Sequence, residues 1–169
     1  ILTSGKLPLF SADKIVSRLY SKNNFRLILF KQFKIKKNLN LKNNIRKKIL
    51  ENKSNIKKLE NIIHPIVRKE MYKFLKKNKK KKLVFMEIPL LIESNLMKIF
   101  DTIIFIKAKK SIRLKRFIKK GGDKRIFNIL NNKQLSDVKK VIFSDIIVTN
   151  DGNIKIFKKN LKDIKKKIY

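Results

Sequence analysis

The chain has 169 residues and a hydrophobic content of 43%, enough for one domain of ordinary size with a buried core. It carries 46 Lys and Arg against 12 Asp and Glu, a net charge of +34, with no Cys and a single His. This composition excludes a disulfide framework, a thiol nucleophile and a cysteine- or histidine-rich metal site. No apolar run approaches the roughly 18 residues of a membrane span, so we expect no membrane segment and a cytoplasmic protein.

The excess positive charge is mostly Lys and is spread along the whole chain, mixed with many Ile and Asn. A specific nucleic-acid-binding protein usually gathers its charge on one face. We therefore favour a solvated lysine surface, with a basic nucleic-acid-binding protein as an alternative from a different class. Either surface would attract a polyanionic ligand.

The first segment ends in Ser4-Gly5-Lys6. These residues match the end of the phosphate-binding motif G-x-x-x-x-G-K-[ST], but Leu7 replaces Ser or Thr and Pro8 prevents the usual helix start. Two readings are open, namely a remnant of a phosphate-binding loop and a chance match of a short string. Because the chain begins with Ile rather than Met, we expect a fragment or a trimmed product.

A buried strand end at residues 9–10 leads into Ser11-Ala12-Asp13 and then into apolar residues at helical spacing. Asp13 is therefore expected where a strand becomes a helix, at the carboxyl edge of a sheet. A carboxylate at that position can accept the proton of an attacking hydroxyl group. The alternative role for Asp13 is a helix N-cap.

Residues 23–55 have helical periodicity, and a further helix follows them. We expect His64-Pro65 to divide that helix in two, because the residue before a proline avoids helical geometry. His64 would then lie at a corner, where a lone His is most often a structural cap.

The chain is organised around residues 82–107, KLVFMEIPLLIESNLMKIFDTIIFIK. Two short apolar runs, 83–88 and 102–106, predict strands buried on both faces and joined by a crossover, as in a parallel sheet. Ligands of such sheets bind beyond the carboxyl ends of the strands. This places Glu87, Pro89 and Glu93 near a site.

The last third of the chain alternates helical and strand patterns. A basic helix over 112–118 ends at Gly121-Gly122, and residues 123–132 are predicted to form a mobile lid. A final buried strand over 145–150 turns at Asn150-Asp151-Gly152, and Asn153 caps the last helix.

Four stretches, in this order, resemble motifs of the dephospho-CoA kinases: Ser11-Ala12-Asp13, IIHPIV at 62–67, EIPLLIE at 87–93, and Gln134-Leu135-Ser136 through Asn150-Asp151-Gly152. The resemblance implies an α/β fold of the P-loop kinase type, with a parallel sheet flanked by helices. It further implies a single domain over 1–169, with a helical substrate-binding insertion at 23–80 and a lid at 119–137.

The resemblance also implies the reaction, which is transfer of the ATP γ-phosphoryl group to the 3′-hydroxyl of dephospho-CoA with Mg²⁺, the last step of coenzyme A synthesis. It implies that Asp13 is the general base, and that the lid brings Arg116 and Arg125 to the transferring group, where they stabilise developing charge. The implied nucleotide-binding residues are Ser4, Gly5, Lys6 and Asn150. The implied substrate-binding residues are His64, Arg68, Pro89 and Glu93. We expect a monomer with no dedicated metal ligands, no specific nucleic-acid partner and no membrane partner.

The chain departs from the family pattern at the phosphate-binding loop and at Asp137, where the family carries an Arg. The second departure reverses the charge at a phosphate-facing position. A catalytically inactive or truncated relative of the kinase is therefore the main alternative.

Overall fold

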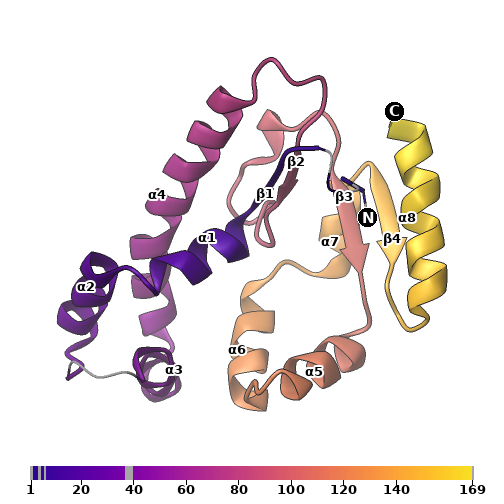
Figure 1. Ribbon diagram of the computed structural model, residues 1–169. Helices are drawn as coiled ribbons and strands as arrows, with labels where there is room; N and C mark the ends of the chain where they lie inside the picture. The colour runs from indigo at the N-terminus through magenta and orange to yellow at the C-terminus, as the bar shows by residue number, and fades with distance from the viewer. Residues whose placement is uncertain (1, 4, 6, 37–39, 169) are drawn as a thin grey trace. The chain divides into compact units, whose positions relative to one another are not determined.

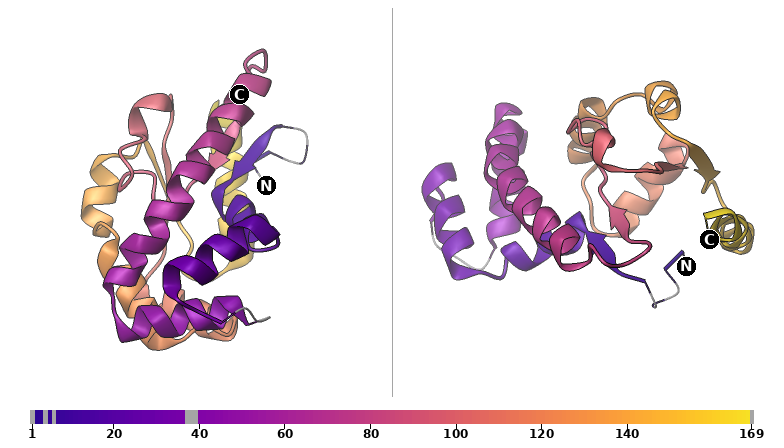
Figure 2. Two further views of the ribbon diagram at one scale, coloured as in Figure 1. Left: turned by 90° about the vertical axis from the view of Figure 1, so that its left-hand side faces the viewer. Right: turned by 90° about the horizontal axis from the view of Figure 1, so that it is seen from above.

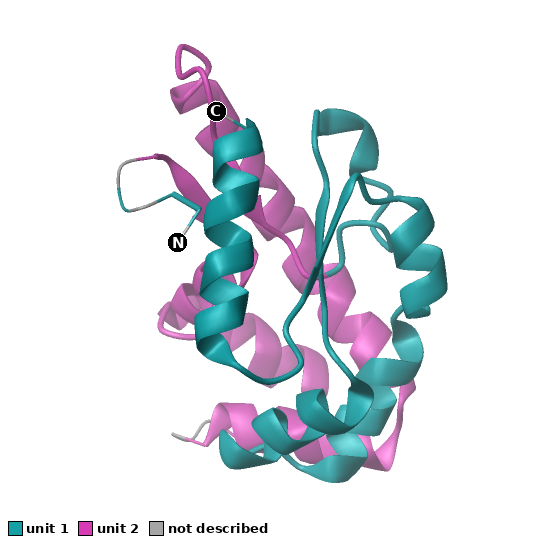
Figure 3. Ribbon diagram, turned by 90° about the vertical axis from the view of Figure 1, so that its right-hand side faces the viewer, with its two compact units in different colours: residues 1–6, 90–169 teal, residues 7–89 magenta. Residues whose placement is uncertain are grey.

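The structure is a computed structural model that describes residues 2, 3, 5, 7–36 and 40–168. The chain divides into two compact units, one of residues 7–89 and one of residues 1–6 with 90–169 (Figure 3). Each unit contains a pair of parallel strands with helices around it (Figures 1 and 2). The α/β class and the parallel pairing that the sequence predicts are confirmed. No helix in the described part of the chain is both long and apolar enough to cross a bilayer.

Unit 2 of Figure 3, residues 7–89, pairs its first and last strands. Its elements are β1 (Leu9–Ser11), α1 (Ala12–Leu19), α2 (Asn23–Phe33), α3 (Leu41–Glu51), α4 (Ser54–Lys77) and β2 (Phe85–Glu87). In the parallel β1–β2 ladder Leu9 lies opposite Phe85 and Ser11 opposite Glu87. The carboxyl ends of both strands therefore meet at one edge.

The core of this unit forms where the short helices pack on α4 and on one another. In α3 the buried residues Leu41, Ile45 and Ile49 recur every four positions, which places them on one helix face. In α2 Leu29 is fully buried, and complete burial of such a side chain contributes about 1.5–3 kcal/mol. At the strands, the ring centroids of Phe10 and Phe74 are 5.7 Å apart. These contacts hold β1 and α4 in a defined arrangement.

The predicted helix break at His64-Pro65 is wrong. Helix α4 runs without interruption from Ser54 to Lys77, with Pro65 inside it. Proline removes one backbone N–H and crowds the carbonyl four residues earlier, which ordinarily ends or kinks a helix. Here buried residues on both sides of the proline, Ile56 and Met71, anchor the two halves in the core, so packing overrides the local preference.

Unit 1 of Figure 3, residues 1–6 with 90–169, contains the remaining elements. They are the 3₁₀ turn η1 (Met97–Ile99), β3 (Ile104–Lys107), α5 (Lys110–Lys119), α6 (Lys124–Lys133), α7 (Asp137–Ile142), β4 (Ile146–Thr149) and α8 (Ile154–Ile168). In the parallel β3–β4 ladder Ile104 lies opposite Ile146 and Lys107 opposite Thr149. Helix α8 packs on β4 and α7 packs on β3 (Figure 1). Asn153 caps α8 as predicted, because its side-chain oxygen accepts a hydrogen bond from the Lys155 amide at 2.8 Å.

The expectation that the strands are buried on both faces is wrong. Only Val148 of β4 is buried, whereas Ile106 of β3 and Ile147 of β4 are nearly half exposed. β2 has no buried residue. A two-stranded ladder presents few neighbours to each side chain, so the apolar run is not covered on both faces. β2 and β3 also pair with β1 and β4, respectively, rather than with each other.

Candidate active site

The first group of candidate residues lies where β1 and β2 end. β1 ends at Ser11 and α1 starts at the next residue, so Asp13 falls in the first turn of α1. The Ser11 side chain accepts a hydrogen bond from the Lys14 amide at 3.4 Å and is the N-cap. Because Ser11 fills the capping position, the alternative role of Asp13 as N-cap does not apply. The positive end of the helix dipole favours a carboxylate in this turn.

Two further sequence candidates lie at the same edge. Glu87 is opposite Ser11 in the ladder and is exposed, and Pro89 follows in an exposed turn. The edge thus carries two exposed carboxylates, Asp13 in the first turn of α1 and Glu87 at the end of β2. Such oxygen atoms suit proton transfer or a hard divalent cation.

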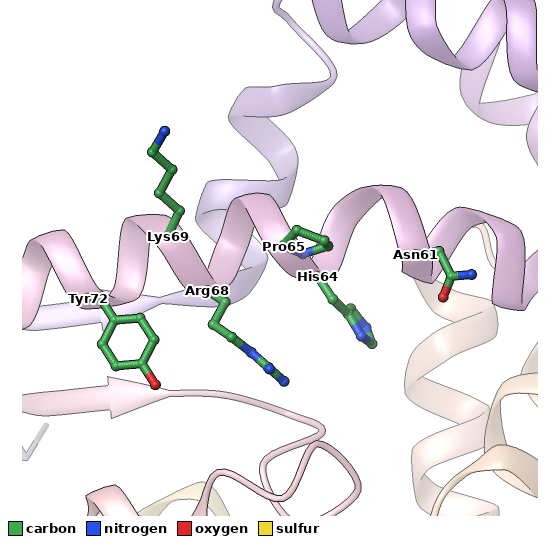
Figure 4. A pocket seen from close by; sticks show the side chains of 6 residues that line it. All are labelled: Asn61, His64, Pro65, Arg68, Lys69 and Tyr72. Atoms are coloured by element: carbon green, nitrogen blue, oxygen red, sulfur yellow. The ribbon is translucent and has the colours of Figure 1, made fainter.

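A pocket of about 530 Å³ lies along one side of α4, lined by Asn61, His64, Pro65, Arg68, Lys69 and Tyr72. Asn61, His64, Arg68 and Tyr72 follow one another at spacings of three and four residues, which places them on one helix face. Figure 4 shows these four side chains extending from the same side of α4, while Lys69 extends away from them. The structure thus brings the predicted pair His64 and Arg68 together in a basic, partly aromatic pocket.

In unit 1, Arg116 and Asn150 form one cluster. The Arg116 guanidinium donates to the backbone oxygen of Asn150 at 3.0 Å and to its side-chain Oδ1 at 3.2 Å. Next to them, the Lys109 amide donates to Asp151 Oδ1 at 2.6 Å, so the start of α5 holds the turn after β4. Oδ1 of Asn150 is used by Arg116, which leaves its side-chain NH₂ group as the donor available to a ligand.

Arg125 is paired within its own helix turn. Its guanidinium lies 3.2 Å from the Asp123 carboxylate, and Asp123 also caps α6 by accepting from the Arg125 and Ile126 amides. The hydrogen bond from the Arg125 side chain holds the pKa of Asp123 below its usual range. Residues 123–132, predicted as a mobile lid, lie mostly within α6 (Lys124–Lys133). They follow Gly121, which has a positive φ of 79° and ends α5.

Glu93 is engaged by the protein itself. Its Oε1 accepts from the Leu135 amide at 3.0 Å and lies 3.1 Å from Lys140 Nζ. Sequence reasoning missed Lys140, because nothing in the spacing of the lysines separates it from its neighbours. It also missed Asp123 as a helix cap, although an Asp before a helical pattern is a recognisable N-terminal signal.

Of the phosphate-loop candidates, only Gly5 is among the described residues. It is an exposed turn residue with a positive φ of 72°, a conformation that favours glycine. Ser4 and Lys6 lie outside the described residues. No cluster of three or more His, Asp or Glu side chains occurs in the described ranges.

Comparison with solved structures identifies the fold. A dephospho-CoA kinase from Campylobacter jejuni matches with a TM-score of 0.65, covering 98% of this chain and 87% of that chain at 23% identity. The fold is therefore the P-loop kinase type of α/β domain.

Sequence comparison identifies the family. The dephospho-CoA kinase family profile matches residues 2–155. The dephospho-CoA kinase of Fusobacterium nucleatum is 30% identical over 156 residues, covering 89% of this chain and 80% of that protein. That of Zymomonas mobilis is 32% identical over 155 residues, covering 88% and 78%. The chain belongs to the dephospho-CoA kinase family.

Proposed function

We propose that this chain transfers the γ-phosphoryl group of ATP to the 3′-hydroxyl of dephospho-CoA. The observation that carries the mechanism is the position of Asp13, an exposed carboxylate in the first turn of α1, directly after β1. Family membership supplies the substrates. The net charge of +34 favours the approach of two polyanionic substrates.

In the proposed reaction Asp13 accepts the proton of the 3′-hydroxyl as its oxygen attacks the γ-phosphorus. The bond from that phosphorus to the β–γ bridging oxygen breaks, and ADP leaves. Mg²⁺ would neutralise charge on the phosphates, with Glu87 as the carboxylate able to complete its coordination. Positioning and charge stabilisation supply most of the rate enhancement in reactions of this kind.

The α4 pocket is the proposed acceptor site. Arg68 offers a guanidinium to the diphosphate of dephospho-CoA, His64 offers a ring N–H, and Tyr72 offers an aromatic face. Pro89 is proposed to contact the same substrate. Residues 23–80 would form the helical cap over it.

The proposed nucleotide site uses residues of unit 1. Asn150, oriented by Arg116, would bind the base, and Ser4, Gly5 and Lys6 would bind the phosphates. Arg125 would meet the transferring group when the lid, residues 119–137, closes. We also propose that residues 1–169 act as one kinase domain, as a monomer in the cytoplasm. Light scattering tests the monomer.

The decisive experiment measures ATP-dependent phosphorylation of dephospho-CoA by the wild type and by Asp13→Asn. We expect Asp13→Asn to lower kcat by roughly 10²–10⁴-fold, the usual contribution of a general base, with an unchanged melting temperature. Asp163→Asn, on α8, makes the same charge change as a matched control and should be fully active. Full turnover by Asp13→Asn would remove Asp13 from the mechanism.

The acceptor pocket is tested separately. Arg68→Ala should raise KM for dephospho-CoA by about tenfold, because a charge-assisted contact is lost. Lys76→Ala, an equally exposed cation in the last turn of α4, should leave KM unchanged. An equal effect of both variants would indicate general electrostatic attraction in place of a specific contact.

A further inference from the structure

A buried ion pair joins Glu93 to Lys140. Their side chains are only 15% and 10% exposed, and Glu93 Oε1 lies 3.1 Å from Lys140 Nζ. Most of the chain's 46 Lys and Arg can keep their charge in water, but Lys140 is a buried one. Removing one member of such a pair leaves an uncompensated buried charge, whereas removing both can be nearly neutral.

Each member of the pair also makes further contacts. Glu93 Oε1 accepts from the Leu135 amide at 3.0 Å, and Lys140 Nζ donates to Gln134 Oε1 at 3.3 Å. The same Nζ lies 6.0 Å from the centroid of the Phe105 ring on β3. Residues 134–136 join α6 to α7. The pair therefore connects this stretch to the turn that carries Glu93 and to Phe105 of β3.

The ion pair and its contacts lie at the C-terminal end of α6, which we call the base of this helix. At the opposite end, α6 begins after Gly121, and its body packs on α5 through Phe127 and Phe117, whose ring centroids are 5.7 Å apart. Gln134 is the C-cap of α6, so the backbone that Glu93 holds follows the last helical turn directly. A shift of this base would move the helix that carries Arg125.

We propose that Glu93 is a positioning residue that acts through Lys140 and the Leu135 amide, and that it holds the base of α6 in place during phosphoryl transfer. Glu93 then binds no part of dephospho-CoA. Its Oε1 is already used by two protein donors, and its Oε2, which has no hydrogen-bond partner in the described part of the chain, is buried out of reach of a ligand in solution. This inference rests on the proposed kinase function, because it assigns α6 and Arg125 to the reaction.

The test is a double-mutant cycle of Glu93→Gln, Lys140→Met and the double variant. Glutamine keeps an oxygen acceptor for the Leu135 amide but removes the charge, and methionine keeps the stem of Lys140 but removes its amine. Lys139→Met, an exposed neighbour on α7, is the matched control. Kinetics with ATP and dephospho-CoA are measured well below each variant's melting temperature, together with hydrogen exchange at the Leu135 amide.

Each single variant should lower kcat by about tenfold and speed exchange at Leu135 by a similar factor, since each leaves a buried polar partner unmatched. The double variant should recover to within about threefold of the wild type in both readouts. KM for dephospho-CoA should stay unchanged throughout, and Lys139→Met should behave as the wild type. If a single variant does not fold, the KM of the double variant for dephospho-CoA and its Leu135 exchange rate still distinguish a positioning role from a direct substrate contact.

Three results would overturn the inference. A direct substrate contact would raise KM for dephospho-CoA in Glu93→Gln and equally in the double variant. A purely stabilising pair would lower the melting temperatures but leave kcat at the wild-type value. If hydrogen exchange at the Leu135 amide is the same in all variants and the wild type, the pair does not hold the base of α6. A wild type without turnover would instead refute the proposed function, and the exchange measurements would still decide whether the pair anchors α6.

Discussion

Replacing Gly122 by alanine tests the packing between α5 and α6. An added Cβ would lie 2.2 Å from Cδ1 and Cε1 of Phe117 and 2.8 Å from its Cγ. Ordinary contact begins near 3.4 Å, so the ring must move by 3.4 − 2.2 = 1.2 Å to restore it. That ring packs on Phe127, which is buried, with the ring centroids 5.7 Å apart. The displacement therefore disturbs the contact that holds the two helices together.

Overpacking of this kind costs about 1–3 kcal/mol of unfolding free energy. Backbone strain adds nothing, since Gly122 does not have a positive φ, whereas Gly121 does. With a urea dependence of about 1–3 kcal/mol per molar, Gly122→Ala should lower the unfolding midpoint by roughly 1 M.

The assay is urea unfolding followed by circular dichroism, with two matched glycine variants. Gly152→Ala has open space and no positive φ, so it should behave as the wild type. Gly121→Ala also has open space but a φ of 79°, so it should lose about 1 kcal/mol through backbone strain alone. Equal stability of Gly122→Ala and Gly152→Ala would refute the steric reasoning.

Two further predictions concern α4 and α6. Pro65→Ala should raise the unfolding free energy by about 2 kcal/mol. Alanine avoids the roughly 3 kcal/mol cost of proline inside a helix, but it also makes the unfolded chain more flexible, which lowers stability by about 0.4–1 kcal/mol. A urea midpoint at or below the wild-type value would contradict this. The Arg125 contact lowers the pKa of Asp123 in the folded state, so its stabilisation of α6 is full above the ordinary carboxyl pKa and is lost as the pH falls through the lowered value. An NMR titration of the Asp123 carboxyl should show the lowered midpoint, and Asp123→Asn, which still caps the helix, should remove this pH dependence; a midpoint at the ordinary carboxyl value would contradict it.

Much of the local structure could be predicted from neighbouring residues. The four-residue spacing in α3, the Asn153 cap of α8 and the end of α5 at Gly121 all follow from preferences that act over one helical turn. The place of Asp13 was predictable for the same reason, because a strand that ends at Ser11 and a helix that begins at once leave it only the first turn. The motif order was enough to indicate the kinase family.

Only the tertiary structure determined the long-range partners. Helix α4 continues through Pro65 because buried residues on both sides hold it, which no local preference reveals. Arg116 reaches Asn150 across 34 positions. Glu93 pairs with Lys140 although the chain offers 46 Lys and Arg against 12 Asp and Glu. With cations at so many positions, sequence spacing cannot select the partner of a given carboxylate. Packing selects it, by burying one lysine beside that carboxylate and leaving the others in water.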